Sequence, residues 1–441
     1  MTKTKKQMGV QQMLLHPEKE TQAILRYLCE QSGKLYNTGV YFARQTFFKT
    51  ERLLTGKFDL VYEPSVGRSV IAQSLPSTPA QQTLMSVTEA FKSYKGLRNL
   101  WFKGQLSNKP KPPNYLKGSK LFKVAYPNSG GQKPKLVDGQ LQFSLGLAVR
   151  RWFGIDSFQL PAPSNLDVDS VKEWTILPKN GAFYLEASYE VSVEQYECGI
   201  DDQALAIDLG TADNLAACVD TLGNSFLIDA RAMKAFNQYW NKQVATRKEN
   251  KPQGYWDNWL DRVTRKRNHR MRDGINKAAK LIINHCLKYG ISTVVIGWNE
   301  GFKDNANMGR VNNQKFVQIP LAKLKDRLEQ LCNKHGVKFE ITEESYTSKA
   351  SYLDGDSLPK YGEKPDGWKA SGRRTKRGLY KTKKGSLVNA DLNGAANIMS
   401  KVARKLGFDL DRLGRRSLTT VARVRLWVLP QSTLSAESPR L

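Results

Sequence analysis

The order of apolar runs between residues 204 and 345 restricts the fold of this 441-residue chain more than any other feature. The runs ALAIDLGTADNLAACVD (204–220) and NSFLID (224–229) meet at a Gly-containing turn and predict a hairpin. The segments that follow are basic helices over 231–289, a buried strand at 292–299, a helix at 321–336 and a strand at 337–345. Elements in this order predict an α/β layer with parallel strands.

The residues before 204 predict a different architecture. Residues 11–105 place apolar side chains mostly at helical spacing, and residues 103–140 are rich in Lys, Pro and Gly, as loops are. Short alternating runs from about 140 to 198 predict a small antiparallel sheet or barrel. Near the C-terminus, residues 389–407 show one last amphipathic helical pattern. The expected fold class is therefore α/β, with a β-barrel and helical regions added to it.

The charge of the chain indicates its partners. There are 69 Lys and Arg residues against 41 Asp and Glu residues, a formal net charge of +28. Charge of this size repels itself unless a polyanion offsets it, and nucleic acid is the first candidate. No apolar run approaches the roughly 18–20 residues that span a bilayer, so we expect no membrane partner and a soluble, cytoplasmic protein. The five cysteines form no Cys-x-x-Cys pair, which argues against a disulfide framework and a cysteine zinc site.

Two aspartates stand where a metal site would need them. Asp208 follows the apolar run ALAI, and Asp391 opens the helical pattern NADLNGAANI, whose small residues allow close packing against a sheet. Both have an ordinary alternative, since an acid at a strand end or a helix start is often only a cap. Acids on the first strand and last helix of a mixed sheet are also what RNase H-type nucleases use to hold two divalent ions against a phosphodiester. Hard oxygen ligands favour Mg²⁺ or Mn²⁺ over zinc.

The chain resembles the TnpB proteins of prokaryotic transposons, which are related to the compact type V CRISPR effectors. Four motifs carry the resemblance, in order and at the spacing of the family: IDLGTADNLAA (207–217), VVIGWNEGFK (294–303), SYTSKAS (345–351) and NADLNGAANI (389–398). The segments KPKPPNY and AQQTLMSVTEAFKS support it in the N-terminal half, so that it covers about residues 5–405. The resemblance implies an RNA-guided DNA endonuclease encoded by a mobile element, with divalent-metal-dependent phosphodiester hydrolysis.

The resemblance also implies partners and domains. The partners would be a guide RNA from the transposon end and double-stranded target DNA, in the cytoplasm of a prokaryote and associated with its nucleoid. The fold would be an RNase H-like (RuvC) nuclease domain preceded by a wedge-type β-barrel that a helical recognition region interrupts. The expected boundaries are 1–20 and 105–200 for the barrel, 21–104 for the helical region, 201–348 and 389–407 for the nuclease domain, 349–388 for a basic loop, and 408–441 for a basic C-terminal tail.

Residues 349–388 depart from the family pattern. TnpB-like proteins usually carry a four-cysteine zinc ribbon here, and this segment contains no cysteine. No zinc site can be built from it, so we expect no zinc in the protein. The segment remains basic and Gly-rich, and we expect it to contact nucleic acid or flank the cleft; the alternative is a solvated surface loop.

The middle acid of the nuclease site is a second departure. Relatives carry a glutamate at the end of the strand beside the first one, where this chain has Ile296 and Gly297. Glu344, at the end of the next strand, is our first candidate for the third catalytic and metal-binding acid beside Asp208 and Asp391, because strand ends of a parallel sheet meet at one edge. Glu300 is the alternative third acid, and a site without a third carboxylate is the remaining possibility.

Basic residues among aromatic ones predict the nucleic-acid surface, since base stacking adds to the attraction of phosphates. The candidate contacts are Arg265, Lys266, Arg267, Arg270, Arg373, Arg374, Lys376 and Arg377. A plain alternative is that the aromatic residues pack helices together and the charges are solvated. For the whole chain, a nuclease-dead RNA-guided DNA-binding repressor is the alternative function, because the strand-end glutamate is missing.

Overall fold

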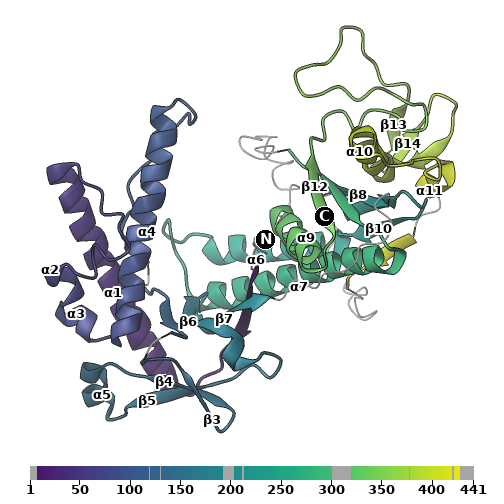
Figure 1. Ribbon diagram of the computed structural model, residues 1–441. Coiled ribbons are helices and arrows are strands. Elements are labelled where there is room, and N and C mark those ends of the chain that lie inside the picture. The colour runs from purple at the N-terminus through teal and green to yellow at the C-terminus, as the bar shows by residue number, and fades with distance from the viewer. Residues whose placement is uncertain are drawn as a thin grey trace, which may run out of the picture. The chain divides into compact units, whose positions relative to one another are not determined.

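The computed structural model describes residues 7–118, 120–129, 131–191, 203–210, 213–299, 319–376, 378–419 and 422–427 (Figure 1). The chain divides into two compact units, Met1–Val191 and Ser192–Leu441, which we describe separately. No helix of the described residues is both long and apolar enough to cross a membrane.

The first unit contains a pair of long helices. Helices α1 (Lys19–Thr50) and α4 (Ser77–Phe102) pack together, and α2 (Pro64–Gly67) and α3 (Val70–Gln73) lie between them in sequence. The close approach depends on Gly39 of α1, where a Cβ atom would lie 3.2 Å from Val87 of α4. The helical pattern predicted for residues 11–105 is therefore confirmed over most of its length.

The strands of the first unit form two antiparallel sheets. A four-stranded sheet has the order β1-β7-β6-β2, and a three-stranded sheet has the order β3-β4-β5. The bounds are β1 Gln7–Leu14, β2 Val124–Pro127, β3 Lys135–Val137, β4 Gln140–Ser144, β5 Ser157–Pro161, β6 Val171–Lys179 and β7 Ala182–Val191, with α5 at Leu147–Phe153. Both sheets share one apolar core with α1 and α4. The predicted antiparallel sheet is therefore confirmed, and among the described residues the strand pairings do not close it into the barrel that the resemblance implied.

The second unit is built on a six-stranded mixed sheet of order β12-β11-β8-β9-β10-β16. Strands β8, β11 and β12 are parallel to one another, β9 is antiparallel to β8 and β10, and β16 is parallel to β10. The bounds are β8 Ala204–Leu209, β9 Asn214–Asp220, β10 Ser225–Asp229, β11 Thr293–Gly297, β12 Lys338–Thr342 and β16 Ala422–Arg425. The predicted α/β layer with parallel strands is confirmed.

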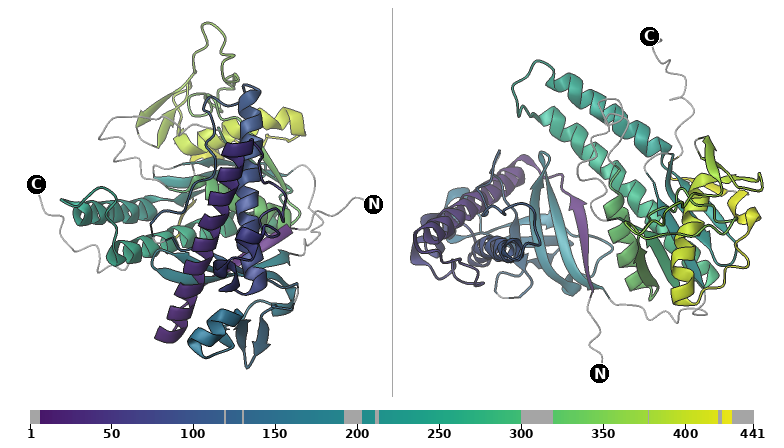
Figure 2. Two further views of the ribbon diagram at one scale, coloured as in Figure 1. Left: turned by 90° about the vertical axis from the view of Figure 1, so that its left-hand side faces the viewer. Right: turned by 90° about the horizontal axis from the view of Figure 1, so that it is seen from above.

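Helices cover both faces of this sheet (Figures 1 and 2). Helix α10 (Ala390–Leu406) packs on one face through its small residues, which form an apolar cluster with β8, β9 and β11. Helices α7 (Asn258–Tyr289) and α9 (Leu321–Lys334) cover the other face, and α6 (Arg231–Lys248) packs along α7. The carboxyl ends of β8, β11 and β12 and the N-terminus of α10 are thereby brought to one edge.

Two parts of the second unit were not predicted as regular structure. The segment expected to be a basic loop contains a small antiparallel sheet, β13 (Arg373–Lys376), β14 (Leu379–Lys381) and β15 (Leu387–Asn389). The expected C-terminal tail supplies the short helix α11 (Arg415–Thr419) and the edge strand β16.

Candidate active site

Asp208 lies on the face of β8 that α10 covers. Side chains alternate along the strand, and Ala204 and Ala206 pack with α10 while the residues between them pack on the opposite face. Asp208 continues the series of Ala204 and Ala206. A Cβ atom on Gly394 of α10 would lie 2.5 Å from Asp208 Oδ2, so the glycine leaves the room that this carboxylate occupies.

The surroundings of Asp208 disfavour its negative charge. Burial raises the pKa of Asp208, the charges of Asp391 and Glu344 raise it further, and Arg374 lowers it, with a resulting pKa of about 8. Within the described part of the chain no hydrogen bond or ion pair satisfies this side chain. A cation bound at this edge would relieve the repulsion, and the strand-end cap that the sequence allowed is not what Asp208 forms.

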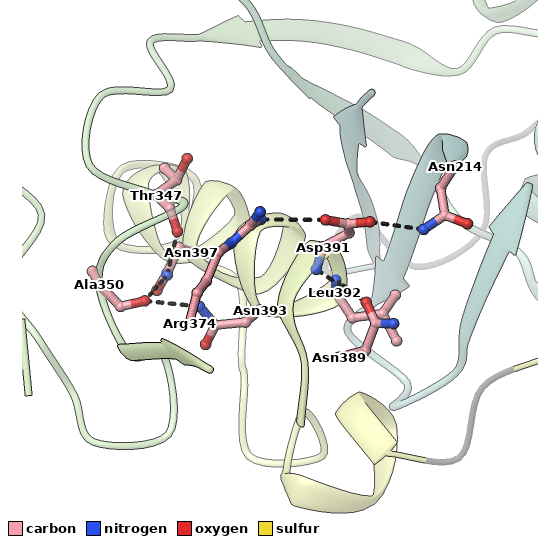
Figure 3. Close-up of polar contacts among 9 residues, drawn as sticks. All are labelled: Asn214, Thr347, Ala350, Arg374, Asn389, Asp391, Leu392, Asn393 and Asn397. Carbon is pink, nitrogen blue, oxygen red and sulfur yellow. Dashed lines mark hydrogen bonds and ion pairs between the residues drawn. The ribbon is translucent and has the colours of Figure 1, made fainter. Parts of the chain in front are cut away.

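Asn389, and not Asp391, caps α10. Its side-chain oxygen accepts hydrogen bonds from the backbone N–H groups of Asp391 and Leu392, both at 3.0 Å. The Asp391 carboxylate therefore points to other partners (Figure 3). Asn214 of β9 donates from Nδ2 to its Oδ2 at 2.7 Å, and Arg374 donates to its Oδ1 at 3.3 Å. Asn214 and Asn389 are site residues that the sequence did not reveal.

Glu344 reaches the same edge from beyond β12. It follows Thr342 by two residues, and Thr342 pairs with Gly297 across the two parallel strands. A Cβ atom on Gly297 would lie 3.2 Å from the Cβ of Glu344 and 2.5 Å from Cδ1 of Ile398. Because Gly297 has no side chain, Glu344 and Ile398 of α10 pack into the space beside it. Position 297 lies where the resemblance led us to expect a glutamate in relatives.

Glu343 and Glu344 are adjacent in the chain but have different partners. Glu343 forms an ion pair with Lys401 at 3.2 Å and accepts a hydrogen bond from the backbone N–H of Ser345. Glu344 is held by Asn299, whose side-chain oxygen accepts its backbone N–H at 3.2 Å. Burial and the charge of Glu343 raise the pKa of Glu344, and the charge of Lys401 offsets only part of this shift. The alternative acid, Glu300, lies outside the described residues.

Two buried asparagines of α10 fix the chain that follows Glu344 (Figure 3). Asn393 and Asn397 both donate to the carbonyl oxygen of Ala350, at 2.7 and 2.8 Å, and Asn397 also donates to that of Thr347 at 2.8 Å. The backbone N–H of Tyr352 donates back to Asn393 at 3.0 Å. The motif NADLNGAANI therefore supplies a helix cap, an acid, the clearance for Asp208 and two side chains that hold the segment following Glu344.

The acids fit a magnesium-type ion better than a preformed metal cage. Among the described residues, no three Asp, Glu, His or Cys side chains lie close enough together to hold a metal ion by themselves. Mg²⁺ is usually held by one or two carboxylates together with substrate phosphates and waters. Asp208 and Asp391, with Glu344 beside them, offer hard oxygen ligands of this kind, and Arg374 is the cation that pairs with one of them. The site therefore fits Mg²⁺ or Mn²⁺ that binds with a phosphodiester.

The cysteine-free segment is ordered by two aspartates. Asp356 accepts hydrogen bonds from the backbone N–H groups of Ser351 and Ser371, at 2.7 and 2.9 Å. Asp354 accepts one from the hydroxyl of Ser351 at 2.6 Å and one from the backbone of Lys383 at 2.7 Å. These contacts connect parts of the segment up to 29 residues apart, where the resemblance implied a zinc ribbon.

The predicted basic contacts of this segment lie on β13. Arg373, Arg374 and Lys376 are all exposed, and Arg374 reaches the site through Asp391. Arg377 lies outside the described residues. The basic segment therefore flanks the acids, which leaves the solvated-loop alternative without support at Arg374.

The predicted contacts on α7 divide into two kinds. Lys266 is exposed, and Arg265 lies partly buried beside it. Arg267 donates to Asn237 of α6 at 2.7 Å with its guanidinium 5.2 Å from the ring of Trp240, and burial lowers its pKa. The guanidinium of Arg270 lies 4.6 Å from the ring of Phe236 and 5.4 Å from that of Trp427. The alternative of aromatic residues packing helices together thus describes part of this surface. The aromatic and basic residues that pack here are Phe236, Trp240, Arg267, Arg270 and Trp427.

Comparisons with known proteins agree with this arrangement. A family model with the description "Probable transposase" (OrfB_IS605) matches residues 184–301, which include Asp208 and β11. The "TnpB-like protein ORF457" of Acidianus two-tailed virus is 24% identical over 430 residues, covering 86% of this chain and 83% of the viral protein. The resemblance to TnpB proteins is confirmed.

The chain also resembles a protein of known structure. A chain in the Cas12f1–sgRNA–target DNA complex is 16% identical with a TM-score of 0.56, covering 86% of this chain and 83% of that one. At this level of identity the likeness concerns the fold. It confirms the predicted fold class, an α/β layer together with helical and antiparallel β regions.

Proposed function

We propose that this protein is an RNA-guided DNA endonuclease of a mobile element that hydrolyses phosphodiester bonds with divalent metal ions. The observation that carries the proposal is the convergence of Asp208, Asp391 and Glu344, from a strand, a helix and a loop, on one edge of the sheet. Arg374 adds a cation beside these acids. Acids and a cation together suit a phosphate whose charge increases during hydrolysis.

The chain's own residues have separate roles in this reaction. Asp208 and Asp391 would hold Mg²⁺ or Mn²⁺, with Glu344 as the third ligand, and the metal when bound supplies Lewis-acid stabilisation and an activated water. Gly394 keeps the Asp208 carboxylate in line with α10, and Asn214 orients the Asp391 carboxylate. Arg374 is placed to exchange its carboxylate partner for a phosphate oxygen of the DNA.

The proposed partners are a guide RNA from the transposon end and double-stranded target DNA. The net charge of +28 and the basic residues of β13 and α7 support nucleic acid as the partner. The structural relative is described in complex with an sgRNA and target DNA. Guide pairing would supply sequence specificity, while the protein reads the backbone and duplex shape.

A nuclease-dead RNA-guided repressor is the second candidate. Gly297 stands where the strand-end acid of the relatives is expected, and Asp391 is paired with Arg374. A repressor has no need of Asp208 in a setting that raises its pKa, because holding a carboxylate among other acids costs stability. The retained acids therefore favour the nuclease.

One experiment tests the proposal as a whole. The protein is expressed with the DNA that flanks its gene, the copurified RNA is sequenced, and its guide portion is replaced with a new sequence. We expect the reprogrammed complex to cut a plasmid that carries the matching target and to leave an unmatched plasmid intact. Guided binding without cutting under Mg²⁺ and under Mn²⁺ would establish the repressor instead, and the absence of bound RNA would refute both candidates.

A further inference from the structure

A cavity lies in the second unit, at the opposite end of the six-stranded sheet from Asp208 and Asp391. Asp208 pairs with Ala217 near one end of the β8–β9 ladder, and Leu205 pairs with Asp220 at the other. The cavity opens beyond Asp220, between the β9–β10 turn, the end of α7, and the segment around α11 and β16. Its volume of about 740 Å³ is in the range of small-molecule sites. The cavity is therefore separate from the proposed nuclease site.

Three cations line this cavity. They are Lys288 of α7, Arg412 before α11, and Arg416 within α11, and all three are exposed. In the part of the chain that the structure describes, none of the three forms an ion pair with a carboxylate. Three positive charges that line one cavity favour an anionic occupant such as a phosphate.

The cavity also has an aromatic wall. Phe226 is almost fully buried, and Tyr289 has 38% of its surface exposed. The ring of His285 lies between them, with centroids 4.9 Å from Phe226 and 4.6 Å from Tyr289. His285 Nε2 is 2.9 Å from the carboxylate of Asp220, which is fully buried and also accepts two hydrogen bonds from Asn224. These contacts fix the His285 ring. The Tyr289 ring, which has the ammonium of Lys288 5.0 Å from its centroid, keeps an exposed part against which a base can lie.

We propose that this cavity binds one phosphorylated nucleoside, with the phosphate on Arg412, Arg416 and Lys288 and the base against Tyr289. The cations match the phosphate of a nucleotide, and the exposed aromatic ring matches its base. A phosphate alone or a base alone would use only one of these two features. The nucleotide has two possible sources: an unpaired nucleotide of the bound RNA, or a free mononucleotide. The inference does not depend on the nuclease activity, because the residues and the edge of the sheet are different.

The test uses the full-length protein with its copurified RNA. Binding of adenosine 5′-monophosphate, adenosine and inorganic phosphate is measured by calorimetry, and the RNA is crosslinked to the protein by ultraviolet light and located by mass spectrometry. The cavity variant is the double substitution Arg412→Gln and Arg416→Gln. The matched control is Arg415→Gln, an exposed arginine of the same short helix that does not line the cavity. Asp208→Asn is included to separate this site from the nuclease site.

Two outcomes support the proposal and identify the source. A free mononucleotide is indicated if the monophosphate binds with higher affinity than adenosine. Its affinity should then fall by about tenfold or more in the cavity variant and stay unchanged in the other variants. A crosslink of the RNA to the peptide containing Tyr289, lost in the cavity variant and kept in Arg415→Gln and Asp208→Asn, indicates a nucleotide of the RNA. The proposal is overturned if the wild type shows no binding of the monophosphate and no crosslink. It is also overturned if the cavity variant and Arg415→Gln show equal losses. Failure of target cleavage with an intact crosslink would count against the nuclease alone.

Discussion

The Cβ of Glu344 lies 3.2 Å from the position that a Cβ on Gly297 would occupy. The glycine of β11 and the acid after β12 therefore use one space, and a side chain at 297 would displace the one at 344. This relationship explains how a sheet edge can lose a carboxylate on one strand and gain it from the next. It also leaves Ile398 of α10 as the neighbour that any side chain at position 297 must displace.

The first prediction concerns the choice between the two adjacent glutamates. Glu344→Gln should reduce guided DNA cleavage by orders of magnitude, because a metal ligand loses its charge, while target binding is retained. Glu343→Gln is the matched control and should cut at close to the wild-type rate, since Glu343 is paired with Lys401 on α10. Cleavage rates and gel-shift affinities of both variants are to be compared. Wild-type cleavage by Glu344→Gln would return the third-acid role to Glu300.

The second prediction concerns Gly394. Gly394→Ala places a methyl group 2.5 Å from Asp208 Oδ2, so the carboxylate must move. We expect cleavage to fall at least about tenfold with little change in DNA affinity, because a displacement of a ligand by roughly 1 Å is costly in catalysis. Gly96→Ala is the control, since a Cβ there meets no atom within 4 Å. Equal rates for the two alanine variants would show that Asp208 need not keep this position.

The third prediction is a pH dependence of stability. The pKa of Asp208 is about 8 in the folded protein against a reference value of 3.8, so folding holds a proton on this group. The contribution of Asp208 to stability is greatest below about pH 4, is lost as the pH rises from about 4 towards 8, and is absent above that. Asp208→Asn should therefore stabilise the metal-free protein by roughly 1–3 kcal/mol at pH 8.5, with the gain shrinking towards pH 4.

Thermal unfolding in EDTA checks this third prediction. Adding Mg²⁺ at pH 8.5 should raise the Tm of the wild type more than that of Asp208→Asn, because only the wild type gains a counter-ion at this carboxylate. A gain from the substitution that is the same at pH 4.5 and 8.5 would contradict the assignment of the pKa to Asp208.

The fourth prediction concerns the segment without cysteines. Purified protein should contain no stoichiometric zinc by elemental analysis, and zinc chelation should leave cleavage unchanged. Asp356→Asn should lower stability by about 1–3 kcal/mol, since a partly buried carboxylate that accepts two backbone hydrogen bonds is replaced. The exposed Asp366 of the same segment offers the control, Asp366→Asn. Tightly bound zinc, or equal stability of both variants, would contradict this account of the segment.

The sequence predicted most of the six-stranded sheet because its strands are apolar and its helices amphipathic. Strands β8, β11 and β12 and helix α10 all fall where the periodicity places them. Strand β16 could not be predicted, because the run ARVR is only four residues long and half of it is Arg, and the strand depends on pairing with β10. The same holds for the open sheets of the first unit, where short alternating runs do not reveal which strands pair.

The candidate site was predictable in its acids and not in its supports. Asp208 and Asp391 stand out because they end an apolar strand and open a helix. The cap at Asn389 shows a signal that was available, since an asparagine two residues before Asp391 is a strong N-cap. The contacts of Asn214 and Arg374 with Asp391 join residues 177 and 17 positions apart, and such pairings depend on tertiary structure.

The most direct test of the central claim is single-turnover cleavage of matched double-stranded DNA by the RNA-loaded protein, with and without Mg²⁺. We predict cleavage by the wild type in Mg²⁺, none in EDTA, and none by Asp208→Asn or Asp391→Asn, although both variants still bind the target. Arg415→Gln serves as a control with an exposed residue far from these acids in the sequence. Cleavage by either aspartate variant at the wild-type rate, or cleavage in EDTA, would contradict the claim that these acids hold the catalytic metal ions.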